Sequence, residues 1–320
     1  MKFASSVLAW TVVSGIVLAC GSSSSSVTNG PVTDQTLEAI AGSFCDHIAT
    51  CYGDFLVKTF IGSGAICKSR LQIEIKASAK GPGVQIKDTE AATCKTAVDA
   101  AACNTLLADG VKECDFRGTL ADGAACASDS QCTSGACFVD AKTDCGKCGA
   151  RAAEAGDCTS SKCARGFTCS AAKNCVKYVA TGGACDANTP CEPSLSCING
   201  KCGKGLAAGA ACKNAANETP CDSFTGLFCK PPSATVADGT CTAFTVASAN
   251  ELCGLTLQPA VDFSVCDNSQ CVGATPTTKG KCQSFLSDGA ACDAAKAPDC
   301  QFPAKCRNGK CAGLVPTACK

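Results

Sequence analysis

The chain has 320 residues, with 28 basic and 28 acidic side chains, a formal net charge of zero and 33 cysteines. Cysteine at about a tenth of all residues is typical of disulfide scaffolds in oxidising compartments and argues against a cytoplasmic enzyme kept reduced. The zero net charge, with no block rich in lysine and arginine, excludes the basic surface that nucleic-acid binding needs.

Residues 1–19 are predicted to be a lipoprotein signal peptide. Lys2 precedes an apolar run that is too short for a membrane span and ends in small residues. Val17-Leu18-Ala19-Cys20 resembles the lipobox of bacterial lipoproteins, although Val17 stands where leucine is commoner. The resemblance implies cleavage before Cys20 and acylation of its sulfur and its new amino group. The alternative is an ordinary secretory signal with a chance cysteine.

Residues 20–30 are predicted to be a lipidated tether. Gly21 is followed by five serines, a composition typical of flexible linkers. Two or three acyl chains on Cys20 would hold the chain stably at a membrane. By the same resemblance, Gly21 in place of aspartate implies sorting to the outer membrane, so we expect a cell-envelope lipoprotein that faces either the periplasm or the outside.

Residues 31–115 are expected to form a helical domain with three disulfides. Apolar side chains recur at three- and four-residue steps from Thr33 to about Phe60, and further helices are predicted at Lys68–Lys80 and Asp88–Leu107. Gly81-Pro82-Gly83 separates the second helix from the third. The six cysteines of this region are Cys45, Cys51, Cys67, Cys94, Cys103 and Cys114.

Residues 116–320 are predicted to be an array of about six four-cysteine modules. Gaps of nine residues recur between cysteines, for example from Cys148 to Cys158, and a glycine turn often precedes the cysteine that ends the gap. We number the modules 1 to 6 in chain order. Their cysteines are Cys126, Cys132, Cys137 and Cys148; Cys158, Cys163, Cys169 and Cys175; Cys185, Cys191, Cys197 and Cys202; Cys212, Cys221, Cys229 and Cys241; Cys253, Cys266, Cys271 and Cys282; and Cys292, Cys300, Cys306 and Cys311.

Short hairpins are expected at the end of a module. Asn199-Gly200 and Asn308-Gly309 each lie midway between two cysteines, which is typical of a two-residue type I′ turn. The cysteines that face each other across the hairpin bond either directly or to earlier cysteines of the module. We favour pairing of first with third and second with fourth, although four cysteines allow three connectivities. The linker aromatics are expected to cover a bridge or to pad neighbouring modules; they are Phe116, Tyr178, Phe244 and Phe285.

Cys145 and Cys319 remain outside the modules. We expect each to pair locally after a reshuffle, because a direct bridge between them would require the array to fold back on itself. Cys145-Gly146-Lys147-Cys148 also resembles the thioredoxin redox motif, which gives an alternative function as a periplasmic thiol-disulfide oxidoreductase. Among so many exported cysteines, a structural role for this C-x-x-C is the favoured interpretation.

His47 is the single histidine, so any Ser-His-Asp or Cys-His pair would have to use it. No G-x-S-x-G motif is present. A zinc site around His47 would need about four ligands and reduced thiolates, which exported cysteines do not usually supply. We therefore predict no catalytic residues, no metal and no cofactor.

The modules resemble the cysteine-rich repeats of predicted lipoproteins from myxobacteria and related deltaproteobacteria, which are similar to the Dickkopf N-terminal cysteine-rich domain and to EGF-like modules. The resemblance rests on glycine turns such as Gly209-Ala210-Ala211-Cys212 and on cysteine spacing over about residues 114–319. It implies a small disulfide-rich fold in which a helical domain precedes short β-hairpin modules. We expect a non-enzymatic envelope protein that binds an unknown protein or glycan or serves as a stalk; a protease-inhibitor or toxin-like scaffold is a further alternative.

Overall fold

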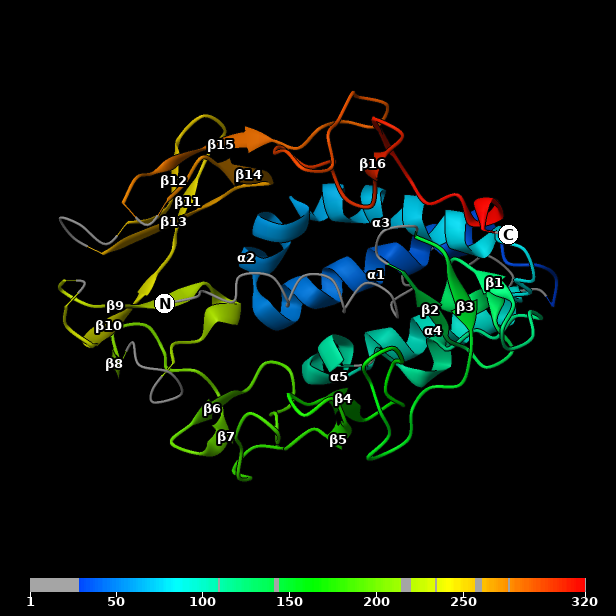
Figure 1. The fold of residues 1–320 in the computed structure, drawn as a ribbon, viewed down its shortest axis with the longest axis horizontal. Helices are drawn as coiled ribbons and strands as arrows, with labels where there is room; N and C mark the ends of the chain where they lie inside the picture. Colours follow the sequence, from blue (N-terminus) through cyan, green and yellow to red (C-terminus); the bar gives the residue numbers. More distant parts are fainter. Residues whose placement is uncertain are drawn as a thin grey trace. The chain divides into compact units, whose positions relative to one another are not determined.

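The computed structural model describes residues 29–319 apart from residues 109, 141–143, 214–219, 234, 257–260 and 276. The predicted signal peptide and Cys20 lie outside the described residues. The chain divides into two compact units, whose elements are drawn in Figure 1. Unit 1 contains the described residues 29–48, 68–178 and 313–319, and unit 2 contains 49–67 and 179–312.

The first part of the chain is helical, as the sequence predicts. Its helices are α1 (Asp34–Tyr52), α2 (Asp54–Leu56), the π-helix η2 (Val57–Ile61), α3 (Gly64–Ala79), α4 (Asp88–Asp99), α5 (Cys103–Ala108) and the 3₁₀ helix η3 (Lys112–Cys114). The prediction of one helix to Phe60 was wrong, because Gly53 has φ 69° and ends α1. The helix predicted at Asp88–Leu107 is likewise divided into α4 and α5. No helix of the described chain is long and apolar enough to cross a bilayer.

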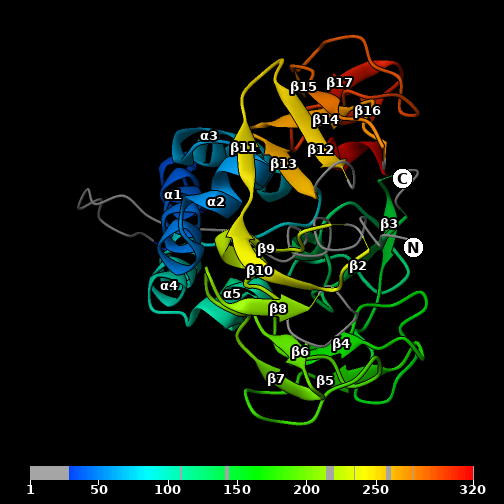
Figure 2. The same ribbon diagram turned by 90° about the vertical axis from the view of Figure 1, so that its left-hand side faces the viewer.

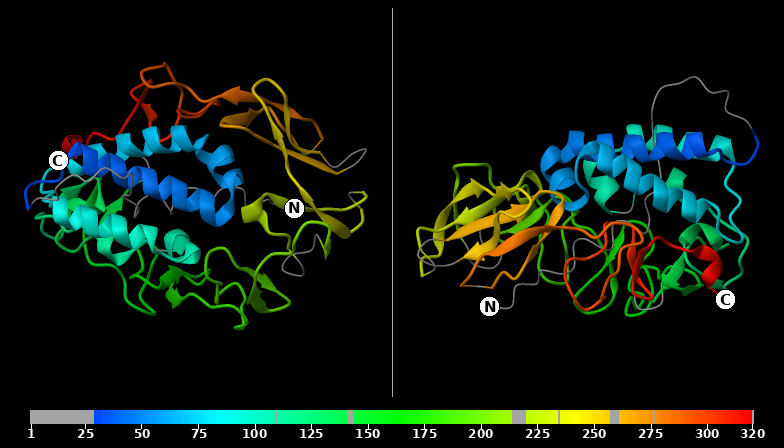
Figure 3. Two further views of the ribbon diagram at one scale, coloured as in Figure 1. Left: turned by 180° about the vertical axis from the view of Figure 1, so that it is seen from behind. Right: turned by 90° about the horizontal axis from the view of Figure 1, so that it is seen from above.

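Buried aliphatic side chains form the core of the helical part of unit 1. Leu37 and Ile40 of α1, Ile75 of α3 and Val98 of α4 are each at most 2 % exposed. Ion pairs join α1 to α3 at the surface, with Lys76 2.5 Å from Glu38. The views in Figures 1 and 3 show α1, α3 and α4 running alongside one another. This region therefore has the apolar core that the cysteine-rich array lacks.

Each module of the array is a small sheet whose strands pair antiparallel, with one parallel strand pair in module 5. The strands are β1 (Ala125–Cys126), β2 (Cys137–Val139) and β3 (Gly146–Cys148) in module 1; β4 (Phe167–Cys169) and β5 (Cys175–Lys177) in module 2; β6 (Ser196–Ile198) and β7 (Lys201–Gly203) in module 3; β8 (Ala211–Lys213), β9 (Leu227–Lys230) and β10 (Asp238–Ala243) in module 4; β11 (Thr245–Ala247), β12 (Leu252–Thr256), β13 (Asp262–Cys266), β14 (Ser269–Val272) and β15 (Gly280–Ser284) in module 5; and β16 (Lys305–Arg307) and β17 (Lys310–Ala312) in module 6. Single 3₁₀ turns complete the chain: η4 (Asp129–Gln131), η5 (Ser223–Thr225) and η6 (Pro316–Ala318). The predicted fold class, a helical region followed by disulfide-bonded hairpins, is confirmed.

The loop Gly81-Pro82-Gly83 holds two other segments of unit 1. In module 1, the Thr119 N–H donates to the Gly83 carbonyl at 2.9 Å, and the buried Gln131 Nε2 donates to the Pro82 carbonyl at 3.0 Å. The C-terminal Pro316 is buried, and its Cβ lies only 3.1 Å from the position that a side chain on Gly81 would occupy. This loop therefore brings the start of the array and the end of the chain to one place.

Aromatic rings join modules 4 and 5 in unit 2. Phe244, in the linker between them, stacks on Phe228 of β9 and meets Phe263 of β13 edge-on, with ring centroids 5.2 Å and 4.8 Å away. Phe55 of α2 stacks on Phe244 at 5.4 Å. Such ring pairs add to the free energy gained from apolar burial. Phe244 therefore packs between neighbouring modules, as the sequence predicts. The strands of the two modules, β9 and β10 of module 4 and β11 to β15 of module 5, are labelled in Figure 2.

Candidate functional site

All 32 cysteines from Cys45 to Cys319 are disulfide-bonded. In every module the first cysteine bonds to the third and the second to the last, which is the pairing that the sequence analysis favours. The two hairpin cysteines lie opposite each other, as Cys197 and Cys202 do, but each bonds to an earlier cysteine. Two bridges therefore hold one face of each hairpin against the preceding loop.

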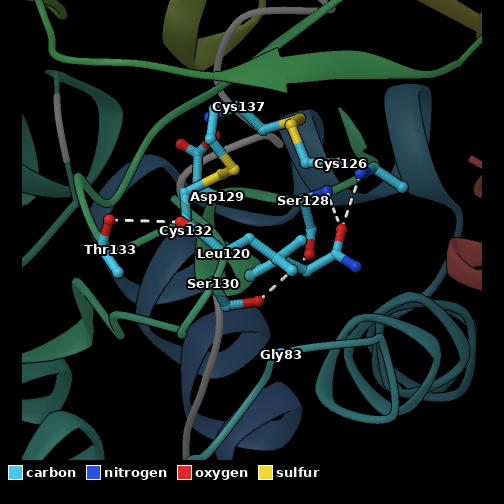
Figure 4. The surroundings of a disulfide bond; sticks show 12 residues. Gly83, Leu120, Cys126, Ser128, Asp129, Ser130, Cys132, Thr133 and Cys137 are labelled. Atoms are coloured by element: carbon cyan, nitrogen blue, oxygen red, sulfur yellow. Dashed lines mark hydrogen bonds between the residues drawn. A yellow bond between two sulfur atoms is a disulfide. The ribbon is translucent and has the colours of Figure 1, made fainter. Parts of the chain in front are cut away.

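The bridges of module 1 illustrate the resulting small core. Cys126, Cys132 and Cys137 are fully buried, and Leu120 packs against them (Figure 4). Their sulfur atoms lie within 4.8 Å of one another. A metal would need thiolates, whereas here the sulfurs are bonded in disulfides. The cluster is thus the hydrophobic core of the module.

A left-handed turn three residues before the first cysteine recurs in all six modules. Its positive-φ residue, with φ between 60° and 84°, is Gly123, Ala155, Gly182, Gly209, Asn250 or Gly289. The N–H of this residue donates to the carbonyl of the module's last cysteine at 2.7–2.9 Å, and the N–H of that cysteine donates back to the following residue at 2.8–2.9 Å. The glycine pattern of the sequence predicts four of these turns. It does not predict the turns of modules 2 and 5, whose left-handed residues are Ala155 and Asn250.

A parallel bridge begins each module and explains the recurring gap of nine residues before modules 2, 3, 4 and 6. The residue six positions before the first cysteine pairs with the second cysteine; these residues are Leu120, Ala152, Val179, Leu206, Ala247 and Leu286. Three linker residues precede this position in modules 2, 3, 4 and 6. We call the two bridges, the left-handed turn and this parallel bridge the frame of a module.

Cys145 bonds to Cys319, and Cys148 bonds to Cys132. The expectation of local pairing for Cys145 and Cys319 was wrong, because the C-terminal segment returns to module 1 within unit 1. The redox reading of Cys145-Gly146-Lys147-Cys148 also fails, because a thioredoxin-like site needs these two cysteines to bond to each other. Gly-Lys-Cys recurs at 200–202, 280–282 and 309–311, and this repeat would have identified Cys148 as a frame cysteine.

His47 has a structural contact. Its Nε2 lies 2.9 Å from the Ala101 carbonyl, just beyond the end of α4. Since a carbonyl oxygen can only accept, the Nε2–H of His47 donates to it. The histidine therefore ties α1 to the segment between α4 and α5.

The loops that the frame leaves free to vary are the candidate binding surface. Between the first and second cysteines they contain five, four, five, eight, twelve and seven residues in modules 1 to 6. Between the third and last cysteines the lengths range from four to eleven residues. Functional residues concentrate on loops of this kind because a rigid scaffold positions them. The structure thus separates a constant frame from variable loops.

An aspartate orders the first loop of module 3. Asp186 Oδ1 accepts hydrogen bonds from the Thr189 hydroxyl at 2.7 Å, the Asn188 N–H at 2.7 Å and the Thr189 N–H at 2.8 Å. The Thr189 hydroxyl first, and then the Asn188 amide, lower the pKa of the Asp186 carboxyl. The same motif occurs in module 2, where the Thr159 hydroxyl and amide lower the pKa of Asp157. These loops are therefore ordered by charge-dependent hydrogen bonds.

We predict that acid loosens this loop. Because the folded pKa of Asp186 is lowered, its stabilisation is complete above the ordinary aspartate pKa of about 3.9 and is lost as pH falls through the lower folded value. Thr189→Val should raise the pKa of Asp186, since it removes the largest cause of the shift. An NMR titration measures the pKa of the Asp186 carboxyl in wild type and variant. The Asp157 carboxyl, whose own threonine is unchanged, is the internal control. An unchanged Asp186 titration in this variant would show that the hydroxyl contact is absent in solution.

Polar side chains fix neighbouring modules to each other. Asp129 of module 1, whose side chain is 16 % exposed, pairs with Arg151 of the linker at 3.0 Å and with Lys162 of module 2 at 2.7 Å. Gln270 of module 5 and Asp299 of module 6 exchange two hydrogen bonds, at 3.0 Å from the Gln270 amide and at 2.7 Å from the Asp299 N–H. These contacts constrain how successive loops are presented.

A comparison with known proteins gives one informative match. A 200-residue alignment is 29 % identical to cell-cell adhesion glycoprotein 64 of Heterostelium pallidum, and it covers 59 % of this chain and 55 % of that protein. The chain thus spans about half the length of this relative. No family model matches the sequence, and no solved structure matches it significantly. The resemblance to myxobacterial, Dickkopf-like or EGF-like repeats therefore stays a prediction.

Proposed function

We propose that the protein is a lipid-anchored, non-enzymatic binding protein of the cell surface with an adhesion-like role. One observation carries the proposal: six modules share the same frame while their loops differ in length and sequence. A scaffold that is stapled by bridges loses little further conformational freedom when its loops bind a partner, which favours affinity. The array is thus suited to present several different loops to a surface.

The comparison supports the adhesive part of the proposal. The relative is named a cell-cell adhesion glycoprotein, and that name describes no chemical reaction. Extensive disulfide bonding fits the oxidising surroundings of an extracellular or surface protein. The lipobox-like Val17-Leu18-Ala19-Cys20 and the serine tether supply an anchor, with the outer membrane as the proposed location.

Replacing Cys20 tests the anchor and the function together. In cells that export the full chain, Cys20→Ala should move the protein from the membrane fraction to the soluble fraction and abolish the added acyl mass, because no lipid is left to insert. Cells that display the wild-type chain should adhere to one another or to a surface, and cells with the variant should not. A Ser22→Ala variant is the matched control. Unchanged membrane association of Cys20→Ala would contradict the anchor, and a normally displayed chain without adhesion would contradict the function.

A further inference from the structure

Each hairpin has a second face, opposite the bridges. Because side chains alternate along a strand, the residues next to the cysteines point away from the disulfides. Three of them are aligned across the module: the residue after the third cysteine, the residue before the last and the residue before the first. In module 3 these are Ile198, Lys201 and Ala184, with Lys201 paired to both neighbours. We call this set the outer row of a module.

The outer rows share a chemical character. Modules 1, 3 and 5 have a lysine between two apolar residues, and modules 4 and 6 have one or two basic residues and no acidic one. The rows are Phe138, Lys147 and Ala125; Ile198, Lys201 and Ala184; Lys230, Thr240 and Ala211; Val272, Lys281 and Leu252; and Arg307, Lys310 and Ala291. Module 2 differs, since its row of Ser170, Asn174 and Asp157 has no basic residue. Five of six modules therefore present positive charge at the equivalent place.

The central lysines are exposed and take part in no ion pair within the described chain. Lys147, Lys201, Lys281 and Lys310 are all exposed, and none of them lies within ion-pair distance of a described carboxylate. By contrast, Lys162 and Lys279 are held by Asp129 and Asp262. The fold thus uses some lysines to fix its modules and leaves the outer-row lysines available.

Apolar surface accompanies these lysines. Leu252 lies directly opposite Lys281 and is 58 % exposed, more than any other large exposed hydrophobic residue of the described chain. An exposed leucine alone needs no explanation. The half-buried Ile198 and Phe138 pair in the same way with Lys201 and Lys147. Each of these three rows therefore places an apolar side chain beside a lysine.

We propose that the outer rows bind an acidic polysaccharide. This proposal rests on the proposed surface-binding function and names the class of partner. The lysine ammonium would pair with a carboxylate or sulfate, and the apolar neighbour would cover the C–H face of a sugar ring. One exposed ion pair contributes little. A polymer with regularly repeated charges engages several rows within one unit, such as those of modules 3 to 6 in unit 2, and such multivalency raises affinity by orders of magnitude. Nucleic acid fits less well, because these rows contain one aromatic residue, Phe138, for base stacking.

Matched triple variants test the assignment. Binding of the full chain, with its disulfides intact, to immobilised polygalacturonate is compared for Lys147→Gln/Lys201→Gln/Lys281→Gln and for Lys173→Gln/Lys177→Gln/Lys204→Gln. Both variants lose three exposed positive charges, but only the first removes them from the outer rows. We expect the first to bind at least about tenfold more weakly and the second to stay within about twofold of wild type. Equal weakening by the two variants would overturn the proposal.

The apolar half of the site has its own test. Leu252→Ser should weaken binding to polygalacturonate and leave binding to poly-glutamate, a polyanion without sugar rings, unchanged. Equal binding of wild type to the two polymers, or no binding to polygalacturonate at low salt, would overturn the proposal. If wild-type chains support cell adhesion but bind no acidic polysaccharide, this inference fails while the proposed function stands. If they bind the polysaccharide but support no adhesion, the proposed function fails.

Discussion

Cys191→Ala/Cys202→Ala is expected to unfold module 3 and leave the other modules intact. The lost bridge spans 11 residues, for which restriction of the unfolded chain gives about 2.8 kcal/mol. Between residues 179 and 202 only Cys185 and Cys202 are buried, so no apolar core compensates for the loss. The Gly182 N–H also donates to the Cys202 carbonyl at 2.7 Å, a bond that the bridge holds in place. The remaining bridge, Cys185–Cys197, does not restrain this turn.

Hydrogen exchange followed by mass spectrometry measures this result. Peptides from residues 179–202 should exchange as an unfolded chain does, while peptides from module 6 keep wild-type protection. The control is Cys145→Ala/Cys319→Ala, which removes a bridge spanning 174 residues. The same entropy formula gives about 5 kcal/mol for that loop, but it assumes a chain with no other cross-links.

The control variant therefore loses the bridge that closes the longer loop, yet it should unfold a smaller part of the structure. Module 1 keeps Cys126–Cys137 and Cys132–Cys148, so its peptides should stay protected. Only residues 313–319 should exchange faster, because they lose their disulfide while Pro316 still packs beside Gly81. Persistent protection of module 3 in the first variant, or unfolding of module 1 in the control, would contradict the view that each module is stapled independently.

The local part of this architecture was predictable from the sequence, and the long-range part was not. Cysteine spacing and Asn-Gly turns encode a frame that closes within a few dozen residues, so the favoured pairing agrees with the structure. The Cys145–Cys319 bridge depends instead on the C-terminal segment docking against the Gly81 loop. No sequence pattern marks such a contact between distant segments.

Backbone conformation limited the rest of the prediction. Apolar periodicity continues past Gly53, where a positive φ ends α1, and past residues 100–102, which separate α4 from α5. Asn250 and Ala155 adopt the left-handed turn without being glycine, so a search for glycine misses them. The sequence alone did not predict that the outer-row lysines occupy equivalent positions, because this alignment depends on the strand register.

Gly280→Ala is expected to disrupt module 5 far more than Gly289→Ala disrupts module 6. A Cβ on Gly280 would lie 2.5 Å from the Val272 carbonyl oxygen and 2.6 Å from the Ala274 nitrogen. Both are backbone atoms of the opposite strand and its turn, and they cannot move without breaking the β14–β15 pairing that aligns Cys271 with Cys282. We expect a loss of at least about 3 kcal/mol, which is the upper range for overpacking a tight site.

Gly289 is the matched control because glycine is favoured there by the backbone conformation and not by lack of space. It has φ 80°, and a Cβ there would meet nothing within 4 Å, so alanine costs only about 1–2 kcal/mol of left-handed strain. Ala155 and Asn250 occupy the equivalent turn in modules 2 and 5, which shows that the frame tolerates a side chain there. The equivalent amides of Cys282 and Cys311, which donate to Glu251 and Ala290, report local opening by hydrogen exchange. Equal acceleration of the two amides would mean that turn strain, rather than close backbone contact, explains both glycines.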